Sequence, residues 1–236
     1  MTFYYVRHGE PIYRPDSLTK KGELQAKALS EKLGQIKIDR IFASTSIRAI
    51  QTAKPTADIC ADSLKDEIKT LDFCYEEYAS DEFSIFENGV KIGWCFDIPA
   101  DIARFNSREI LSLGKEWYDA SEFFDKRYKE GLLRIGMGAD ALLSELGYDH
   151  DIENGRYIAR APSNENVALF AHKGFGLVFL SWILDIPYNI FSTRFDIGHS
   201  SVTVVEFNDV DGVCYPKVKT LSNDAHLYKN GLTMEY

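Results

Sequence analysis

The residues best suited to chemistry begin with Arg7 and His8, which follow the short apolar run Phe3–Val6. Such a run is typical of a buried strand, and consecutive side chains of a strand point to opposite faces. Arg7 and His8 can therefore serve one site only if the strand ends there and the chain turns, which Gly9 allows. A guanidinium and an imidazole at a strand end would suit an anion that is held and attacked.

Two further basic residues also follow predicted strands. Arg48 opens a predicted helix after a short strand, and His172 follows the apolar run 166–171. Because ligands bind outside the carboxyl ends of parallel strands, we expect Arg7, His8, Arg48 and His172 to meet in one crevice. Two guanidiniums match the oxygen atoms of a phosphoryl group and spread its charge in the transition state. A neutral imidazole beside them can attack phosphorus in line.

The order of predicted elements defines the scaffold that would position these groups. Strands and helices alternate, then an insertion follows, then a strand, a helix and two strands. This order predicts one α/β domain over residues 1–236, with three α/β/α layers and a mostly parallel central sheet. The aromatic-rich segment 74–155 is predicted to be a helical cap over the strand ends. Within it we expect one long helix from Ser121 to Gly147, and we expect Pro55 to break an earlier helix.

Composition limits the class of protein. The chain has 236 residues, 45% of them hydrophobic, which suffices for one substantial core. No apolar stretch reaches 18 residues and no signal region precedes the first strand, so we expect a cytoplasmic protein with no membrane partner. The net charge of -9 argues against nucleic acid as a partner. Four scattered cysteines and the lack of HxxxH or HxH spacing predict neither disulfides nor a metal site.

Three segments resemble one known family. Arg7-His8-Gly9-Glu10 resembles the first signature of the histidine phosphatase superfamily, which includes the cofactor-dependent phosphoglycerate mutases. Arg48-Ala49-Ile50-Gln51-Thr52-Ala53 resembles the second signature of that family. His172-Lys173-Gly174, between a strand and an apolar helix, resembles the segment that carries its second catalytic histidine.

The resemblance implies a role for each of the four basic residues. His8 would be the nucleophile that forms a phosphohistidine. His172 would be the second catalytic histidine and would bind the phosphoryl oxygens in its protonated form. Arg7 and Arg48 would hold the phosphate. Either Glu10 or a neighbouring backbone carbonyl could fix the His8 ring.

The general acid lies where the resemblance ends. Larger members of the family use a glutamate just after the third strand, followed by a Gly-x-Trp-Glu-Gly turn that this chain lacks. Asp72, flanked by apolar residues at a predicted strand end, is the preferred candidate. Glu76 and Glu77 are alternatives, although solvated residues of the insertion are the simpler interpretation of both. Arg14 stands where many relatives have an asparagine, and it either contacts phosphate or faces solvent. His199 is predicted to have a structural or supporting role.

The predicted function is therefore that of a phosphoric monoester hydrolase, a phosphatase that needs no metal and no cofactor. Its partner would be a small phosphorylated substrate. A phosphoglycerate mutase-type phosphoryl transferase is the nearest alternative, and a catalytically weak phosphate-binding protein is another. The sequence leaves the oligomeric state open.

Overall fold

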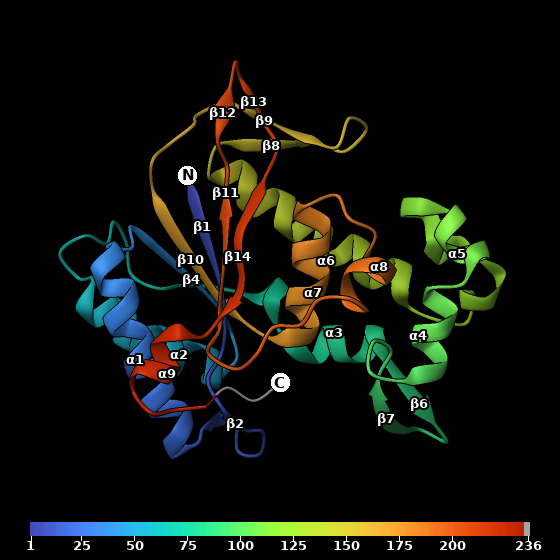
Figure 1. The fold of residues 1–236 in the computed structure, drawn as a ribbon, viewed down its shortest axis with the longest axis horizontal. Coiled ribbons are helices and arrows are strands. Elements are labelled where there is room, and N and C mark those ends of the chain that lie inside the picture. The colour runs from blue at the N-terminus through green and yellow to red at the C-terminus, as the bar shows by residue number, and fades with distance from the viewer. Residues whose placement is uncertain (234–236) are drawn as a thin grey trace.

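The computed structural model describes residues 1–233 and has a six-stranded sheet between two layers of helices (Figure 1). The strands are ordered β14-β11-β1-β10-β4-β5, and β11 runs opposite to the other five. In that order their bounds are Lys217–Asn223, Val202–Glu206, Thr2–Arg7, Asn166–Ala171, Arg40–Ser44 and Lys69–Leu71. The predicted three-layer α/β/α fold with a mostly parallel sheet is confirmed.

Helices cover both faces of this sheet (Figure 1). One face carries α1 (Lys20–Ile36), α2 (Ile47–Ile59) and the short α9 (Ala225–Lys229). The other face carries α3 (Glu76–Phe83), α6 (Tyr128–Glu145), α7 (Lys173–Ile183) and α8 (Tyr188–Ser192).

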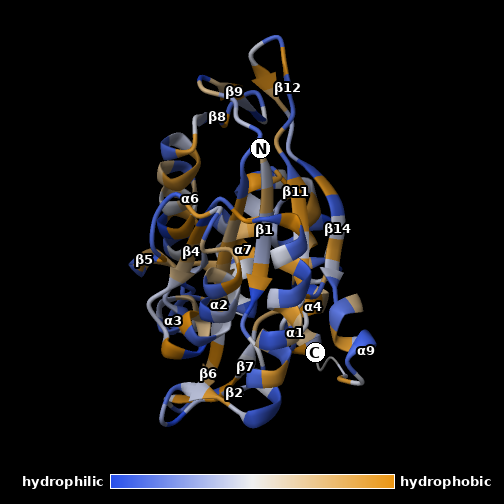
Figure 2. Cartoon of the chain, turned by 90° about the vertical axis from the view of Figure 1, so that its left-hand side faces the viewer, coloured by the Kyte–Doolittle hydropathy of each residue, from blue (hydrophilic) through white to orange (hydrophobic). Residues whose placement is uncertain are grey.

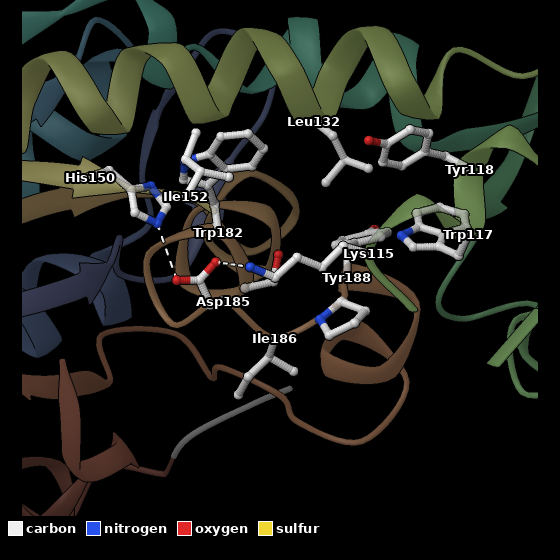
Figure 3. Close-up of a pocket in the computed structure, with 12 residues that line it drawn as sticks. Lys115, Trp117, Tyr118, Leu132, His150, Ile152, Trp182, Asp185, Ile186 and Tyr188 are labelled. Atoms are coloured by element: carbon white, nitrogen blue, oxygen red, sulfur yellow. Dashed lines mark hydrogen bonds and ion pairs between the residues drawn. The ribbon is translucent and has the colours of Figure 1, made fainter. Parts of the chain in front are cut away.

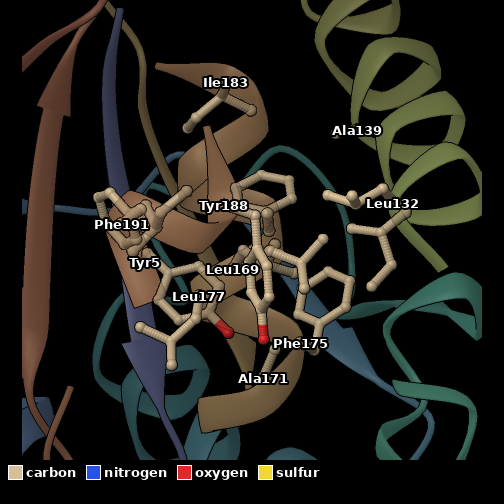
Figure 4. Close-up of a cluster of buried hydrophobic side chains, with 14 of the residues drawn as sticks. Tyr5, Leu132, Ala139, Leu169, Ala171, Phe175, Leu177, Ile183, Tyr188 and Phe191 are labelled. Carbon is tan, nitrogen blue, oxygen red and sulfur yellow. The ribbon is translucent and has the colours of Figure 1, made fainter. Parts of the chain in front are cut away.

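The alternation of side chains along β1 divides the interior into two cores. Tyr4 and Val6 belong to the smaller core, under α1 and α2. Tyr5 belongs to the larger core, where it stacks on Phe175 and Phe179 of α7 (Figure 4). The helices α1 and α2 are both orange and blue along their length (Figure 2), as expected of helices with one buried face, whereas α7 is buried at nearly every position.

The helix α2 contradicts the expected break at Pro55. It runs without interruption from Ile47 to Ile59, with Pro55 inside it. Its buried face includes Ala49, Ala53 and Thr56, and α2 packs against α1 and the sheet. Tertiary packing of this face therefore outweighs the hydrogen bond that proline removes.

The segment 74–155, which the sequence predicts to be a cap, divides into two parts. It contains a hairpin of β6 (Ser84–Glu87) and β7 (Val90–Trp94), then α4 (Pro99–Phe105) and α5 (Arg108–Ser112), which extend to one side of the molecule (Figure 1). Its last helix, α6, instead packs along α7 and forms part of a layer.

The helix α6 also starts later than expected, at Tyr128, and residues 121–123 form a separate 3-10 turn. The rings of Phe123 and Tyr128 pack together at 5.6 Å, which requires the chain to turn between them. The glycines that weaken α6 as an isolated helix admit large neighbours. A Cβ at Gly136 would lie 2.4 Å from the Trp182 ring, so the close approach of α7 requires glycine there.

A second, four-stranded sheet lies at the end of the molecule away from the strand ends that carry the site (Figure 1). It has the order β12-β13-β9-β8, with bounds Asp209–Val210, Val213–Cys214, Arg156–Ala159 and Tyr148–Asp151. Two short strands, β2 (Pro11–Ile12) and β3 (Ser17–Leu18), pair in the loop after β1. Among the described residues, no helix has the length and apolar character needed to cross a membrane.

Candidate active site

The carboxyl ends of three neighbouring strands bring the predicted residues together. Arg7 at the end of β1 is in register with Ala171 at the end of β10, and β4 ends beside β10. His172 follows β10 as the first residue before α7, and Arg48 lies in the first turn of α2. The rings of His8 and His172 consequently lie 5.1 Å apart. The structure thus places all four basic residues in one site.

The ring of His8 is held in a single orientation. Its Nδ1 lies 2.7 Å from the carbonyl oxygen of Gly9, which can only accept, so Nδ1 carries the proton and Nε2 keeps a lone pair. Burial, with the nearby His172 and Arg7, lowers the pKa of His8 well below its usual value. Glu10 instead accepts a hydrogen bond from the Thr19 hydroxyl at 2.8 Å. The backbone carbonyl, and not Glu10, therefore orients the ring.

Arg48 connects both histidines. Its Nε donates to Nε2 of His8 at 3.3 Å, and its Nη2 donates to Nδ1 of His172 at 3.2 Å. Because Nδ1 of His172 accepts, its Nε2 carries the proton and donates to the Ser44 hydroxyl at 2.8 Å. Burial, Arg48 and Arg7 lower the pKa of His172 well below its usual value. His172 is thus neutral, whereas the family resemblance implied a protonated residue bound to phosphoryl oxygens.

The position of Arg48 depends on Asp16, which sequence reasoning missed. One carboxylate oxygen of Asp16 accepts from Nη1 of Arg48 at 2.7 Å. The other accepts from the backbone N–H of Ile47, also at 2.7 Å, and so caps the start of α2. No sequence pattern indicates this contact, because Asp16 lies in the loop between β2 and β3, far from α2 in the sequence.

Arg7 is held by two residues of the loop before β11. Its Nη1 donates to the carbonyl of Ile197, and its Nη2 donates to Nε2 of His199, both at 2.7 Å. Burial and the Arg7 charge lower the pKa of His199 to about 3, so the ring is neutral. His199 thus contacts Arg7, as expected of a supporting residue. The buried Nε of Arg7 has no hydrogen-bond partner among the described residues, so it can still donate to an anion.

Arg7, His8 and Arg48 line a pocket of about 390 Å³, whereas His172 is fully buried and does not line it. Glu76, at the start of α3, lines this pocket, and its two oxygens accept from the backbone N–H groups of Gly174 and Phe175, each at 3.2 Å. Burial raises the pKa of Glu76 to about 7, although the two N–H groups and Arg48 oppose this rise. A carboxyl group beside His8 can thus carry a proton near neutral pH. The pocket is lined by Arg7, His8, Tyr13, Arg48, Glu76, Glu77, Ser80, Lys91, Trp94, Asp97 and Lys173.

The remaining predicted residues, Asp72, Glu77 and Arg14, are all exposed. Asp72 is exposed in a 3-10 turn directly after β5 and lies outside this pocket. Glu77 is exposed and lines the pocket beside Glu76. Arg14 is exposed and lies outside the pocket, so it faces solvent.

A second pocket lies between α6 and the end of α7 (Figure 3). His150 contacts Asp140 at 2.9 Å and Asp185 at 3.2 Å, and Lys115 also binds Asp185. Burial opposes a charge on His150, but the two carboxylates outweigh it and raise its pKa to about 9. The charged groups of this pocket therefore satisfy one another. Within residues 1–233, no cluster of three or more His, Cys, Asp or Glu side chains is suited to a metal ion.

Comparison with known proteins agrees with the fold described above. Residues 3–73 match the family model of the histidine phosphatase superfamily (branch 1). A phosphoserine phosphatase mutant from Entamoeba histolytica, solved with phosphoserine, is 16% identical, with a TM-score of 0.60 over 96% of this chain and 98% of that chain. A mycobacterial glucosyl-3-phosphoglycerate phosphatase, solved with VO3, is 17% identical, with a TM-score of 0.59 over 94% and 98%. No curated protein matches the sequence.

Proposed function

We propose that this protein is a phosphoric monoester hydrolase that acts through a phosphohistidine at His8. The premise is that residues 3–73 match the histidine phosphatase family model and that the chain has the fold of such phosphatases. The observation that carries the proposal is the state of His8. Its ring is neutral, its Nδ1–H is held by the Gly9 carbonyl, and Nε2 keeps the lone pair that attacks phosphorus.

The phosphate would bind where the N–H groups of Arg48 now converge. A bound phosphoryl group would replace His8 and His172 as the acceptor of these N–H groups, because a charged oxygen accepts more strongly than a neutral imidazole. That exchange would free Nε2 of His8 for attack. The unpaired Nε–H of Arg7 would donate to the same group. A dianion there would also favour the protonated form of His172.

The reaction proceeds in two steps: the phosphoryl group is transferred to His8 and then from His8 to water. In the first, Nε2 of His8 forms a bond to phosphorus while the bond to the leaving alkoxide breaks, and Glu76 gives the alkoxide its proton. In the second, water attacks phosphorus, Glu76 takes a proton from it, and the bond to Nε2 breaks to release phosphate. We assign this acid–base role to Glu76 in place of Asp72, since Glu76 lines the pocket with a pKa near 7 whereas Asp72 lies outside it.

Two features support the substrate class and setting. The similar structures include phosphatases of phosphoserine and of glucosyl-3-phosphoglycerate, which favours a small phosphorylated substrate. All four cysteines, which lie within the described residues, are free and buried, and this favours a reducing compartment such as the cytoplasm.

Hydrolysis of p-nitrophenyl phosphate in the presence of a chelator tests the proposal. The wild type should release free phosphate, and His8→Ala should lose this activity because no other group supplies the nucleophile. Activity that requires added metal, or that persists in His8→Ala, would contradict the mechanism. Transfer of the phosphoryl group to an added alcohol in preference to water would instead indicate a mutase-type transferase.

A further inference from the structure

The hairpin β6–β7 supplies one wall of the pocket. Its two strands are joined by Asn88 and Gly89, whose positive φ angles of 51° and 77° suit the two-residue turn typical of such hairpins. Lys91 and Trp94 of β7 line the same pocket as the phosphate-binding arginines. The hairpin lies outside residues 3–73, the range that matches the family.

Lys91 carries a charge that nothing in the described chain neutralises by direct contact. Its Nζ donates to the Ser80 hydroxyl at 2.8 Å and lies 3.9 Å from the centre of the Trp94 ring. No carboxylate of residues 1–233 forms an ion pair with it. An ammonium group has three N–H donors, and Ser80 accepts only one of them. By contrast Lys173, in the same pocket, is paired with Asp196 at 2.9 Å.

The Trp94 ring gives Lys91 a fixed support. A Cβ at Gly174 would lie 2.3 Å from the indole, so the ring packs directly against the start of α7. The ring of Phe96 stacks on the indole, with the two ring centres 5.4 Å apart. The indole face thus holds the ammonium by a cation–π contact. Lys91 is exposed at the mouth of the pocket, and partial burial lowers its pKa against the opposing charges of Glu76, Glu77, Asp81 and Asp97.

We propose that Lys91 forms a subsite for a second anionic group of the substrate, so that the substrate is a small phosphomonoester that also carries a carboxylate or a second phosphate. This inference rests on the proposed phosphatase function. Arg7 and Arg48 take the phosphoryl group to be transferred, while the two remaining N–H donors of Lys91 take the second anion. Glu76, Glu77 and Asp97 line the same pocket. Glu77 and Asp97 are exposed, so solvent screens their repulsion of an anion, and Glu76 exerts none in its protonated form.

Matched substrates test the subsite. Phosphoglycolate carries a carboxylate, ethylene glycol bisphosphate carries a second phosphate, and ethylene glycol monophosphate carries a neutral hydroxyl at the same place. The measured quantity is the ratio of kcat/KM for each anionic substrate to kcat/KM for the neutral one. A change in the groups that bind or attack the transferred phosphoryl group alters kcat/KM for both substrates and cancels in this ratio. Comparison of the two anionic substrates shows which second group the subsite takes.

Lys91→Met should lower the preferred ratio on the order of 10- to 100-fold, the loss expected of a charge-assisted hydrogen bond. Lys91→Arg should retain most of the preference because it keeps the charge. Lys69→Met is the control for net charge, since Lys69 lies on β5 and pairs with Glu145 away from this pocket, and it should leave the ratio unchanged.

Two results would overturn the inference: one leaves the phosphatase function intact, and the other overturns that function as well. An unchanged ratio in Lys91→Met, with the neutral substrate still hydrolysed through His8, would remove the subsite and leave the phosphatase function intact. Failure of the wild type to hydrolyse p-nitrophenyl phosphate and all three esters would overturn the phosphatase function, and the subsite with it.

Discussion

Replacing Glu76 with glutamine separates its role as an acid from its place in the pocket. The two side chains have nearly the same shape, so Glu76→Gln removes the proton donor with little change in packing. General acid catalysis typically contributes about 10²–10⁴-fold. We therefore expect hydrolysis of alkyl phosphates to slow by at least about 100-fold. Hydrolysis of p-nitrophenyl phosphate should change far less, because its leaving group needs little protonation.

The pH dependence of the wild type follows from the same group. With a pKa of about 7, Glu76 is protonated in roughly half of the molecules at pH 7. The kcat/KM for an alkyl phosphate should fall as the pH rises above this value, since the protonated form is the competent acid. This alkaline fall should be absent from Glu76→Gln.

The raised pKa of Glu76 also makes the stability of the fold depend on pH. Its pKa rises from 4.5 in the unfolded chain to about 7 in the folded protein, so the folded state binds the proton more tightly. The group therefore costs nothing below pH 4.5 and destabilises the fold increasingly between pH 4.5 and 7. At about 1.36 kcal/mol for each tenfold change in proton affinity, the full cost is about 3 kcal/mol.

Urea unfolding of both proteins at pH 4.5 and at pH 8 measures this cost. The free energy of unfolding of Glu76→Gln, relative to the wild type, should rise by about 3 kcal/mol between the two pH values. Any hydrogen bond lost to the amide adds a constant that cancels in this comparison. Glu77→Gln is the matched control, because Glu77 is exposed on the same turn. Parallel pH curves, or equal kinetic losses on alkyl and nitrophenyl phosphates, would refute the assignment of Glu76.

Three further predictions concern the groups around the two pockets. Arg48→Ala should lose charge-assisted contacts of about 1.5–3 kcal/mol, so vanadate should raise the Tm of the wild type but not of this variant; equal protection would place the anion elsewhere. Asp16→Ala should lower the free energy of unfolding by about 1 kcal/mol in urea, since α2 loses its cap, and no change would show that the cap is dispensable. The raised pKa of His150 stabilises the fold fully below pH 6.5, and this contribution of about 3 kcal/mol should disappear as the pH rises through about 9 in the wild type but not in His150→Gln. A pH profile shared by both proteins would contradict the charged state of His150.

The sequence could predict the positions of the four basic residues because local patterns determine where each strand ends. Arg7 and His8 follow an apolar run, and His172 follows another, so the general rule for parallel sheets places them at one edge. Arg48 follows from its place in the first turn of a helix after a strand. The structure brings all four together, and predicting this required no information on contacts between residues distant in the sequence.

The general acid could not be chosen in this way. The choice between Asp72 and Glu76 depends on the turn after β5, where the 3-10 turn Asp72–Cys74 leaves Asp72 exposed and α3 then carries Glu76 into the pocket. The contacts that hold Glu76 come from Gly174 and Phe175, about a hundred residues later. No periodicity in the sequence reports such a contact.

The wall of the pocket was also missed, although a signal for it exists. Asn88-Gly89 lies between two short apolar-rich runs, which is a strong indication of a two-residue hairpin turn. Recognition of that hairpin would have placed Lys91 and Trp94 on one strand but on opposite faces, because side chains alternate. The register shift between the pairs Ile85–Gly93 and Phe86–Lys91, which brings them to one side, has no signal in the sequence. Asp16 differs, because its contact with Arg48 joins a loop to a remote helix and leaves no local pattern.

The central claim is that phosphorus becomes bonded to Nε2 of His8. The most direct measurement is rapid acid-free quenching of the protein during turnover of a phosphorylated substrate with a chelator present, followed by peptide mass spectrometry under alkaline conditions. We predict a base-stable, acid-labile phosphate on the peptide that contains His8, and none in His8→Ala. A phosphate found on another residue, or turnover by wild type with no phosphorylated His8 even for substrates whose second step is slow, would contradict the account.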